Sequence, residues 1–256
     1  MVEALDNLIQ PLFTMPLEQA AWCVLLENAL IFAAALVIGH LAVRVFKTHP
    51  ITEPPPPITP IEIVLAASCV LLNAFITWLG VVLWRAGVVQ LRPAGSLFNI
   101  LVDFVALFFA MDFAMYVFHR AAHLPILYRL IHDTHHRFEN PRPLTLFVLN
   151  PFETLGFGML WLVVISIYQS SFAGMMLYLT LNVAFGLMGH LGVEPFPRRW
   201  LELPLIRYIS TSTFHAEHHQ DRHHNYGFYT VIWDRLFGTL SPVYSDEFQS
   251  AAAPPQ

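Results

Sequence analysis

The feature that most limits how this chain can fold is a series of long apolar runs. Three of them, at residues 22–46, 61–84 and 97–118, reach the roughly 20 residues that a helix needs to cross a bilayer. The last run contains only two charges, Asp103 and Asp112, and the second has none in its interior. Only 12% of the 256 residues are charged, about half the share usual in soluble domains, which excludes an ordinary soluble fold.

Two further apolar runs, at 144–168 and 172–188, are separated only by a short polar link, Gln169–Ser170–Ser171. A link of this length predicts a helical hairpin. The first two long runs are joined by TEPPPPITP at 52–60, whose four consecutive prolines favour an extended loop. The sequence therefore predicts an all-α integral membrane protein with about three transmembrane helices plus a helical hairpin.

The distribution of Arg and Lys predicts the orientation of the chain in the membrane. Basic residues accumulate in cytoplasmic loops, and the segment before Arg44 has none. With the N-terminus outside, Arg44, Lys47 and the nine arginines after residue 118 lie inside, and only Arg85 and Arg92 lie outside. We expect a multi-pass protein of a bacterial inner membrane or the endoplasmic reticulum. The net charge of −5 argues against a nucleic-acid partner.

Histidine is over-represented, and its positions are clustered. The chain has 13 histidines, about twice the share in average composition. Eleven of them lie between 119 and 224, chiefly in HRAAH at 119–123, HDTHH at 132–136 and HAEHH at 215–219. The i, i+4 spacing in each motif places two rings on one helix face, one turn apart. His190 stands alone after the fifth apolar run.

Such spacing is typical of metal coordination, because neutral imidazoles on adjacent turns can bind the same ion or neighbouring ions. Up to nine candidate imidazoles are too many for one ion and suit two metals with four to six ligands each. Two isolated cysteines, Cys23 and Cys69, exclude a thiolate site. Redox iron is favoured over structural zinc, although imidazole also suits zinc, copper and nickel. We expect the histidine motifs to form a helical cap that holds a dimetal site at the cytoplasmic face of the membrane.

Several other residues are candidates for support. Asp112 lies two turns before His119 on the same helix face and could orient a ligand histidine through its second ring nitrogen. Asp103 is out of phase with Asp112, and we interpret it as an interfacial residue near the outer leaflet. His40 is interpreted as a packed or interfacial side chain, and His49 as a solvated loop residue.

The three motifs, in this order, resemble the fatty acid hydroxylase/sterol desaturase superfamily of membrane di-iron enzymes. MYVFHRAAHLPILYRLIHDTHH and HAEHHQDRHHNYGFYTVIWDRLFGT are similar to the corresponding stretches of sterol C-5 desaturases. The NYG at 225–227 and WDRLFGT at 233–239 are hallmarks of this group. The resemblance covers about residues 112–239, half of the chain.

The resemblance implies metal-ligand roles for nine histidines and possible supporting roles for a few neighbours. The implied ligands are His119, His123, His132, His135, His136, His190, His215, His218 and His219. The possible supporting residues are Asp112, Glu194, His223, His224 and Asn225. Glu194 stands where hydroxylase members often have a further histidine, and Asn150-Pro151 stands where many members have His-Pro.

The resemblance also implies a reaction. Two iron ions would use O2 as co-substrate to hydroxylate or desaturate a lipid C–H bond. A sterol or isoprenoid-like ring substrate is favoured, and a fatty acyl or ceramide chain is the alternative. We expect no fused electron-carrier domain, so that electrons come from a separate cytochrome b5-type protein, ferredoxin or reductase.

Three segments and two rival functions complete the prediction. Residues 1–96 form an N-terminal membrane region with two spans, 97–242 a fatty acid hydroxylase-type catalytic domain, and 243–256 a flexible tail. An intramembrane zinc protease is disfavoured because the chain has neither HExxH nor HxxEH. A non-enzymatic metal transporter or haem-carrying electron-transfer protein is disfavoured because the histidine clusters adjoin span ends rather than midplanes.

Overall fold

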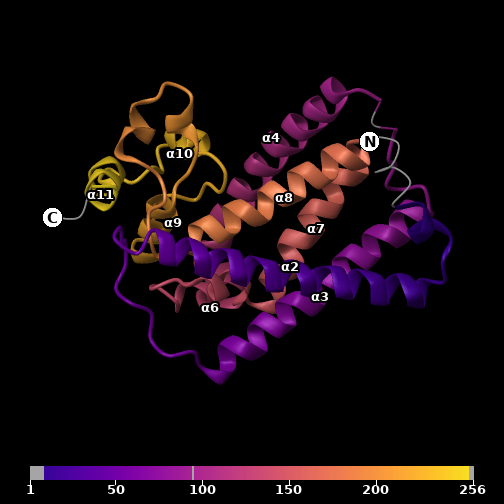
Figure 1. Ribbon diagram of the computed structural model, residues 1–256, viewed down its shortest axis with the longest axis horizontal. Coiled ribbons are helices and arrows are strands. Elements are labelled where there is room, and N and C mark those ends of the chain that lie inside the picture. Colours follow the sequence, from indigo (N-terminus) through magenta and orange to yellow (C-terminus); the bar gives the residue numbers. More distant parts are fainter. Residues whose placement is uncertain (1–8, 94, 254–256) are drawn as a thin grey trace.

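The computed structural model describes residues 9–93 and 95–253, and every regular element in that part of the chain is a helix (Figure 1). Four helices are long and apolar enough to cross a membrane: α2 (Leu17–Val45), α3 (Pro60–Arg85), α4 (Leu97–Ala122) and α8 (Phe172–Gly189). A shorter apolar helix, α7 (Pro151–Ile167), forms a hairpin with α8. The predicted all-α membrane protein with three long helices and a hairpin is confirmed.

Helices α3, α4, α7 and α8 each start with a side chain that caps the free backbone N–H groups of the first turn. Ser96 and Ser171 accept hydrogen bonds from the backbone at the starts of α4 and α8, and Thr59 forms a capping box with Glu62 at the start of α3. The run predicted from 144 starts its helix only at Pro151, because Asn150 caps that helix and proline suits its first turn. Before it lies the 3₁₀ helix η2 (Pro143–Phe147).

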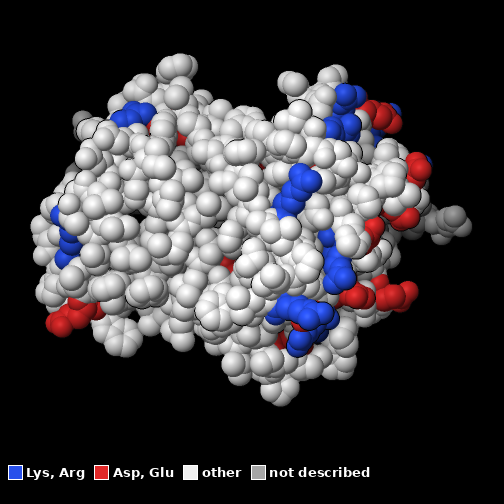
Figure 2. Space-filling model, turned by 180° about the vertical axis from the view of Figure 1, so that it is seen from behind, with Lys and Arg blue, Asp and Glu red and all other residues white. Residues whose placement is uncertain are grey.

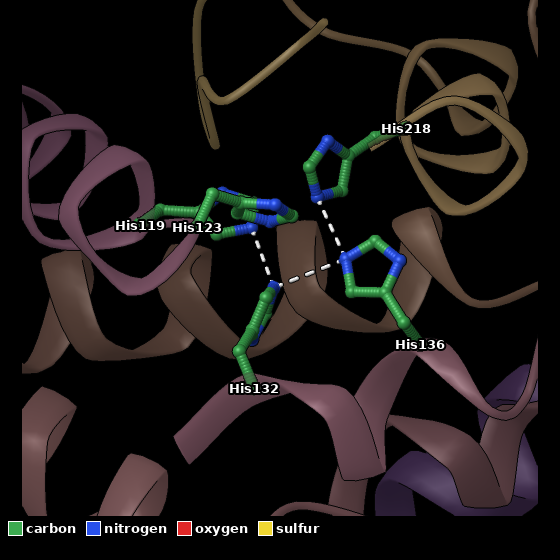
Figure 3. Close-up of side chains that lie close together, drawn as sticks. All are labelled: His119, His123, His132, His136 and His218. Atoms are coloured by element: carbon green, nitrogen blue, oxygen red, sulfur yellow. Dashed lines mark hydrogen bonds between the residues drawn. The ribbon is translucent and has the colours of Figure 1, made fainter. Parts of the chain in front are cut away.

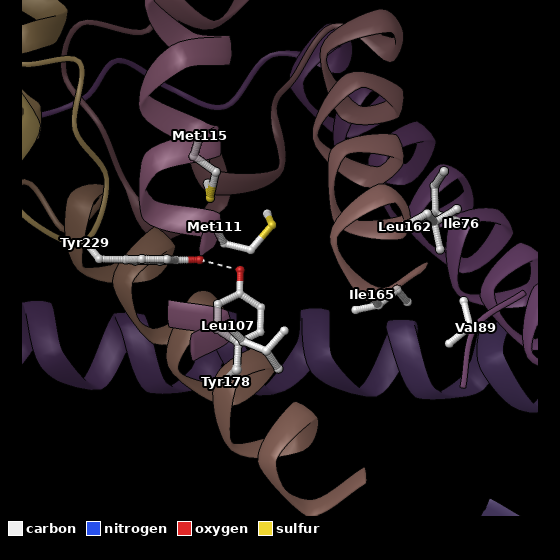
Figure 4. Close-up of a cluster of buried hydrophobic side chains, with 9 residues drawn as sticks. All are labelled: Ile76, Val89, Leu107, Met111, Met115, Leu162, Ile165, Tyr178 and Tyr229. Atoms are coloured by element: carbon white, nitrogen blue, oxygen red, sulfur yellow. Dashed lines mark hydrogen bonds between the residues drawn. The ribbon is translucent and has the colours of Figure 1, made fainter. Parts of the chain in front are cut away.

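The main core lies where α3, α4, α7 and α8 meet, and it is entirely apolar except for two tyrosine hydroxyls (Figure 4). Its buried members are Ile76, Val89, Leu107, Met111, Met115, Leu162, Ile165, Tyr178 and Tyr229. Gly158 lets α7 approach α3 closely, since a Cβ there would lie 2.6 Å from Cγ1 of Ile76. This packing fixes the direction in which α4 and α8 deliver their last turns.

The outer faces of these helices are apolar and exposed, which is the reverse of a soluble bundle. On α4 the exposed large side chains recur every three or four residues, at Val102, Val105, Phe109, Phe113 and Val117. Figure 2 shows a broad surface almost free of charge, with most charged side chains gathered toward the end that carries the C-terminal helices. An uncharged band of this kind is what the hydrocarbon core of a bilayer requires.

The two ends of the bundle are defined by contacts between distant loops. At one end the link after α2 pairs with the segment after α8, where Ile51 N–H donates to Gly192 and Glu194 N–H donates to His49. At the other end Arg92 forms an ion pair with Asp103 and donates to the α7–α8 link. Arg44, in the last turn of α2, and Lys47, in the link that follows, therefore lie at the histidine end.

Asp103, interpreted from the sequence as an interfacial residue near the outer leaflet, is enclosed within the protein. Its side chain is fully buried and accepts hydrogen bonds from the hydroxyl of Tyr168 and from the backbone and side chain of Ser171. Together with the ion pair to Arg92, these bonds compensate for removing the carboxylate from water. Asp103 thereby ties the start of α4 to the hairpin, far along α4 from the histidines.

The C-terminal region forms a compact cap of short helices: α9 (Ser212–Gln220), α10 (Ile232–Phe237) and α11 (Tyr244–Ala251), preceded by η3 (Arg198–Glu202) and η4 (Ile206–Tyr208). Residues 243–253 differ from the predicted flexible tail, because Tyr244 and Phe248 of α11 pack into a buried cluster with Phe214 and Val231. The rest of that segment, 254–256, lies outside the described residues, as do 1–8 and 94.

Candidate metal centre

Four separate helical segments deliver the nine candidate histidines to one end of the bundle. The last turn of α4 carries His119, and His123 caps that helix. The chain then starts α5 (Pro125–Leu127) at a proline and continues through a π-helical turn, η1 (Tyr128–His132), into α6 (Asp133–His136). Single π turns of this kind often occur at functional sites because they redirect side chains.

The other two segments come from the hairpin and the cap. His190 follows α8 directly, and α9 carries His215, His218 and His219. Thr211 caps α9 by accepting a hydrogen bond from the N–H of Phe214. The residues of α8 and α9 beside these histidines are mostly buried, so the positions of the rings are fixed by packing and not by solvent-exposed loops.

Five of the histidines form a first group: His119, His123, His132, His136 and His218 (Figure 3). Each offers a ring nitrogen that lies within 4.8 Å of the others. The Nε2 atoms of His119 and His132 are 3.0 Å apart, those of His132 and His136 are 3.2 Å apart, and those of His136 and His218 are 3.1 Å apart.

The remaining four histidines form a second group: His135, His190, His215 and His219. Here the Nε2 atoms of His215 and His219 are 3.1 Å apart, and those of His190 and His215 are 3.4 Å apart. The two groups are neighbours, since the ring centres of His136 and His219 are only 4.9 Å apart. The structure thus brings together all nine histidines that the resemblance implied as ligands.

The grouping does not follow the sequence motifs one by one. The i, i+4 pairs stay together: 119 with 123, 132 with 136, and 215 with 219. The middle histidine of HDTHH, His135, belongs to the second group, while the middle histidine of HAEHH, His218, belongs to the first. Two motifs are therefore shared between the two groups, which links the groups rigidly.

The hydrogen bonds of the outer ring nitrogens assign the tautomers. Nδ1 of His119 lies 2.9 Å from the carbonyl of Tyr226, Nδ1 of His218 lies 2.6 Å from that of His224, and Nδ1 of His190 lies 2.7 Å from that of Gly186. Carbonyl oxygens only accept, so each Nδ1 carries the proton. The Nε2 atoms of these three rings, which face the other histidines, then each carry an unprotonated lone pair.

Bare lone pairs at this separation repel one another, and a cation between them removes the repulsion. With metal–nitrogen bonds of about 2.1 Å, adjacent ligands lie about 3.0 Å apart at right angles and about 3.4 Å apart in a tetrahedron. The observed Nε2 separations of 3.0–3.4 Å match this range. The residues present therefore fit two metal ions, one in each group, with only nitrogen ligands among the described residues.

Burial keeps the rings in the neutral form that binds metal. It lowers the pKa of His136 to about 3 and that of His190 to about 4. Burial also lowers the pKa of His135, His215 and His219 well below the usual value for histidine. Protonated imidazole cannot act as a ligand, so the interior is already prepared for a cation at neutral pH.

Glu153, to which the sequence motifs gave no role, contacts the first group directly. Its Oε1 accepts a hydrogen bond of 2.6 Å from Nδ1 of His132, and both side chains are buried. A carboxylate that holds the outer nitrogen of a ligand histidine fixes the ring and raises its basicity. The available signal was an acidic residue in the first turn of an otherwise apolar helix, α7.

Asp112 does not have the predicted role of orienting a histidine. Its carboxylate accepts hydrogen bonds from the backbone of Tyr229 and Thr230, the hydroxyl of Thr230 and the indole of Trp233. It therefore ties the cap to α4 rather than touching a ring. The i, i+7 spacing to His119 was correct, but the cap supplies donors that occupy every acceptor site of the carboxylate.

Glu194 and the residues after α9 support the cap and lie outside both groups. Glu194 accepts hydrogen bonds from the backbone and hydroxyl of Thr213, at the start of α9. Asn225 adopts a φ of 60° and donates to the carbonyl of Phe214 and to Glu217. His224 contributes its backbone carbonyl to His218, while its ring pairs with Asp221.

The two isolated N-terminal histidines and His223 also lie outside both groups. His40 is exposed on α2, and its Nδ1 lies 2.6 Å from the carbonyl of Leu36. His49 contacts the hydroxyl of Thr48 in the loop after α2. His223 is exposed in the turn after α9. None of the three approaches the nine clustered rings closely enough to join them.

Comparison with known proteins places the chain in a family. The model of the family described as fatty acid hydroxylase matches residues 104–239, which is more than half of the chain and includes all nine clustered histidines. The chain belongs to the fatty acid hydroxylase family. Sterol desaturases are among its relatives, as the motifs indicated.

Three relatives illustrate the range of this family. The chain is 28% identical over 157 residues to a human lathosterol oxidase, 31% identical over 158 residues to a cholesterol 25-hydroxylase-like protein of Danio rerio, and 32% identical over 166 residues to a very-long-chain aldehyde decarbonylase of Oryza sativa. These alignments cover 59%, 61% and 61% of this chain.

The same alignments cover 49%, 62% and 25% of the relatives' own lengths, so the chain spans less than two thirds of each. No solved structure shows a significant match to the chain. The family match at residues 104–239 includes the α7–α8 hairpin and most of the cap as well as the histidines, and the printed names of the relatives differ in substrate and reaction. Family membership therefore supports lipid oxidation but does not identify the lipid.

Proposed function

We propose that this protein is a membrane-bound di-iron oxidoreductase that uses O2 to hydroxylate or desaturate a C–H bond of a lipid. The observation that carries the proposal is the convergence of nine imidazoles in two adjacent groups, five and four, with a ring nitrogen of each within 4.8 Å of the others in its group. Membership of the fatty acid hydroxylase family supports the same reaction class.

The donor set supports iron in preference to other metals. Neither group contains a thiolate or a carboxylate, and nine nitrogens exceed what two tetrahedral zinc ions require. The first group would be formed by His119, His123, His132, His136 and His218, and the second by His135, His190, His215 and His219. When bound, a pair of redox-active iron ions supplies the electrons and the oxygen activation that cleavage of an unactivated C–H bond needs.

The protein's own residues would contribute orientation and the exclusion of water. Carbonyl groups and Glu153 hold the ring planes through the outer nitrogens, so the inner nitrogens keep their directions before any ion binds. Eight of the nine rings are at most 9% exposed, which keeps bulk water from the reacting carbon. The adjoining spans present their apolar faces to lipid, so a lipid substrate would enter laterally from the bilayer.

We favour a sterol or isoprenoid-like ring as the substrate, with a fatty acyl or ceramide chain as the alternative. The motif likeness to sterol C-5 desaturases and the sterol-oxidising relatives support the first choice. We further propose that residues 97–242 form the catalytic domain on the N-terminal membrane region 1–96. The basic residues at the histidine end support a cytoplasmic location for the centre.

A second candidate is a non-enzymatic metal or electron-transfer membrane protein. The tightly grouped histidines alone would also serve that function, and the family match is the observation against it. Both proposals predict metal binding, but only the enzyme consumes O2 in proportion to oxidised lipid.

Metal analysis and lipid profiling together test the proposal. Anaerobic reconstitution of the full chain in nanodiscs should give close to two irons per chain, as two groups of four to six nitrogen ligands would hold. Expression in a host that lacks the activity should then produce a hydroxylated or desaturated lipid. One zinc with peptidase activity, a haem spectrum, or iron without any O2-dependent lipid product would overturn it.

A further inference from the structure

The first histidine group comes nearest to the surface of the protein beside Tyr128. His123 is half-buried, whereas the other eight clustered rings are almost fully enclosed. The Tyr128 ring lies beside it, with centroid distances of 5.4 Å to His123 and 5.6 Å to His136. A short path of contacting rings therefore runs from Tyr128 into the group.

An exposed arginine covers this point. The guanidinium carbon of Arg222 lies over the Tyr128 ring, 4.9 Å from its centroid, in the geometry of a cation–π contact. The hydroxyl of Tyr226 donates to the backbone carbonyl of Arg222 and so holds the turn that carries it. The ring of Tyr226 also lies 5.1 Å from that of His123. The position of Arg222 is thus set by residues that contact the histidine group.

The surface around Tyr128 carries an excess of unpaired positive charge. Arg120, Arg129 and Arg222 are exposed, and none has a carboxylate partner within the part of the chain that the structure describes. The carboxylates nearby have partners of their own: Asp133 pairs with Arg137, and Asp221 pairs with His224. We call the surface formed by Arg120, Tyr128, Arg129 and Arg222 the Tyr128 face.

We infer that the Tyr128 face is the docking surface for an acidic one-electron carrier protein, of the haem or iron–sulfur class, that reduces the centre. This inference rests on the proposed function, which needs electrons that the chain's own residues do not supply. In the step itself no bond forms or breaks. Two reduced carrier molecules each lose one electron in turn, and the two ferric ions become ferrous.

Charge and surroundings favour a protein partner over lipid headgroups at Arg222. The exposed neighbours of Arg222 are polar: Gln220, Asp221 and His223. Exposed apolar side chains of the kind that enter a membrane interface, such as Ile126 and Leu130, flank Arg129 instead. Redox complexes are typically small and transient, and opposite charges speed their formation.

The first experiment measures binding and does not depend on the reaction. The metal-free full chain in phosphatidylcholine nanodiscs is titrated with two acidic probes, the soluble domain of a cytochrome b5 and a plant-type ferredoxin. At least one should bind, with an affinity that falls about fivefold or more on Arg222→Glu and on raising salt from about 0.05 to about 0.5 M. Arg222→Lys keeps the charge and should retain most of the affinity.

Arg199→Glu is the matched control, because it makes the same charge change at an exposed arginine of η3, outside the Tyr128 face. Equal losses in Arg199→Glu and Arg222→Glu would overturn the inference, as would no binding of either probe. If Arg222→Glu leaves the affinity for both probes unchanged and alters only how readily the protein enters nanodiscs that contain anionic lipid, the face binds lipid headgroups and the inference is wrong.

The second experiment separates this inference from the proposed function. Iron-loaded protein is reduced either by the bound carrier or by photoreduced deazariboflavin, a small neutral reductant. In Arg222→Glu the ratio of carrier-driven to deazaflavin-driven rates should fall about fivefold or more. An unchanged ratio overturns the docking surface. Failure of deazaflavin-reduced protein to oxidise any lipid would instead count against the proposed function, while leaving the binding result intact.

Discussion

The two histidine groups are built from the same side chain but are held differently. In the first group three outer nitrogens have partners from two segments: the carbonyls of Tyr226 and His224 in the turn after α9, and the carboxylate of Glu153 in α7. In the second group His190 is held by the carbonyl of Gly186, whereas the buried Nδ1 of His219 has no hydrogen-bond partner among the described residues.

The groups also differ in access and in ligand number. The first offers five nitrogens and approaches the surface at His123, whereas the second offers four and adjoins a small cavity lined by Phe185, Gly189 and Phe228. A metal with fewer protein ligands keeps open positions for a small reactant. The first group is therefore the more firmly anchored and, under the proposed function, the one through which electrons would enter, whereas the second would leave more open coordination positions.

The largest expected effect comes from removing one ligand of either group. His119→Ala should empty the first group and His135→Ala the second, so iron falls from close to two toward one per chain, and turnover drops by more than the roughly 10–100-fold typical of a supporting residue. Iron analysis and lipid product formation measure both. His40→Ala is the control, since that ring lies outside both groups. Full turnover by either ligand variant would contradict the assignment.

Glu153 tests whether anchoring distinguishes the first group. Replacing it by Ala removes the acceptor from Nδ1 of His132, so we expect about 10–100-fold weaker iron retention in the first group, measured by chelator competition. Glu153→Gln keeps an acceptor oxygen and should lose less. The second group should retain its iron in both variants, and equal loss from both groups would show that the two are not held independently.

A smaller effect should come from Gly189, which borders the second group. A Cβ there would lie 3.1 Å from Cδ2 of His215, so Gly189→Ala should shift that ring and weaken the second group's iron binding by a few-fold. Gly186→Ala, whose Cβ meets the flexible end of Leu146, is the comparison within the same helix. Loss of iron from the first group instead would mean that the shift passes through the shared motifs.

The smallest expected effect on either group comes from Asp112. Because its four hydrogen bonds go to Tyr229, Thr230 and Trp233, Asp112→Asn should lower the free energy of unfolding by about 1–3 kcal/mol and leave iron per folded chain unchanged. Thermal unfolding and iron analysis of the same sample measure both quantities. Reduced iron at unchanged stability would restore the role of orienting a histidine.

Much of the fold could be read from the sequence because its signals are local. Bilayer thickness sets the length of an apolar helix, so the three long spans and the hairpin were predicted close to their observed positions. The errors occurred where hydropathy or composition was not the signal that decided the structure. Hydropathy did not detect that Asn150 and Pro151 start α7, and composition did not reveal that Tyr244 and Phe248 bury α11 against the cap.

Within the candidate centre, the three pairs of histidines four residues apart follow from sequence spacing alone. Residues four apart on a helix lie one above the other, and for this reason 119 with 123, 132 with 136, and 215 with 219 each face one point. Consecutive residues point about 100° apart around a helix axis, so His135 and His136 turn toward different neighbours. The packing of α4, α8 and α9 decides which neighbours His135 and His136 meet, through contacts between residues that are up to about a hundred positions apart. The same tertiary packing brings Glu153 to His132 and the donors of the cap to Asp112.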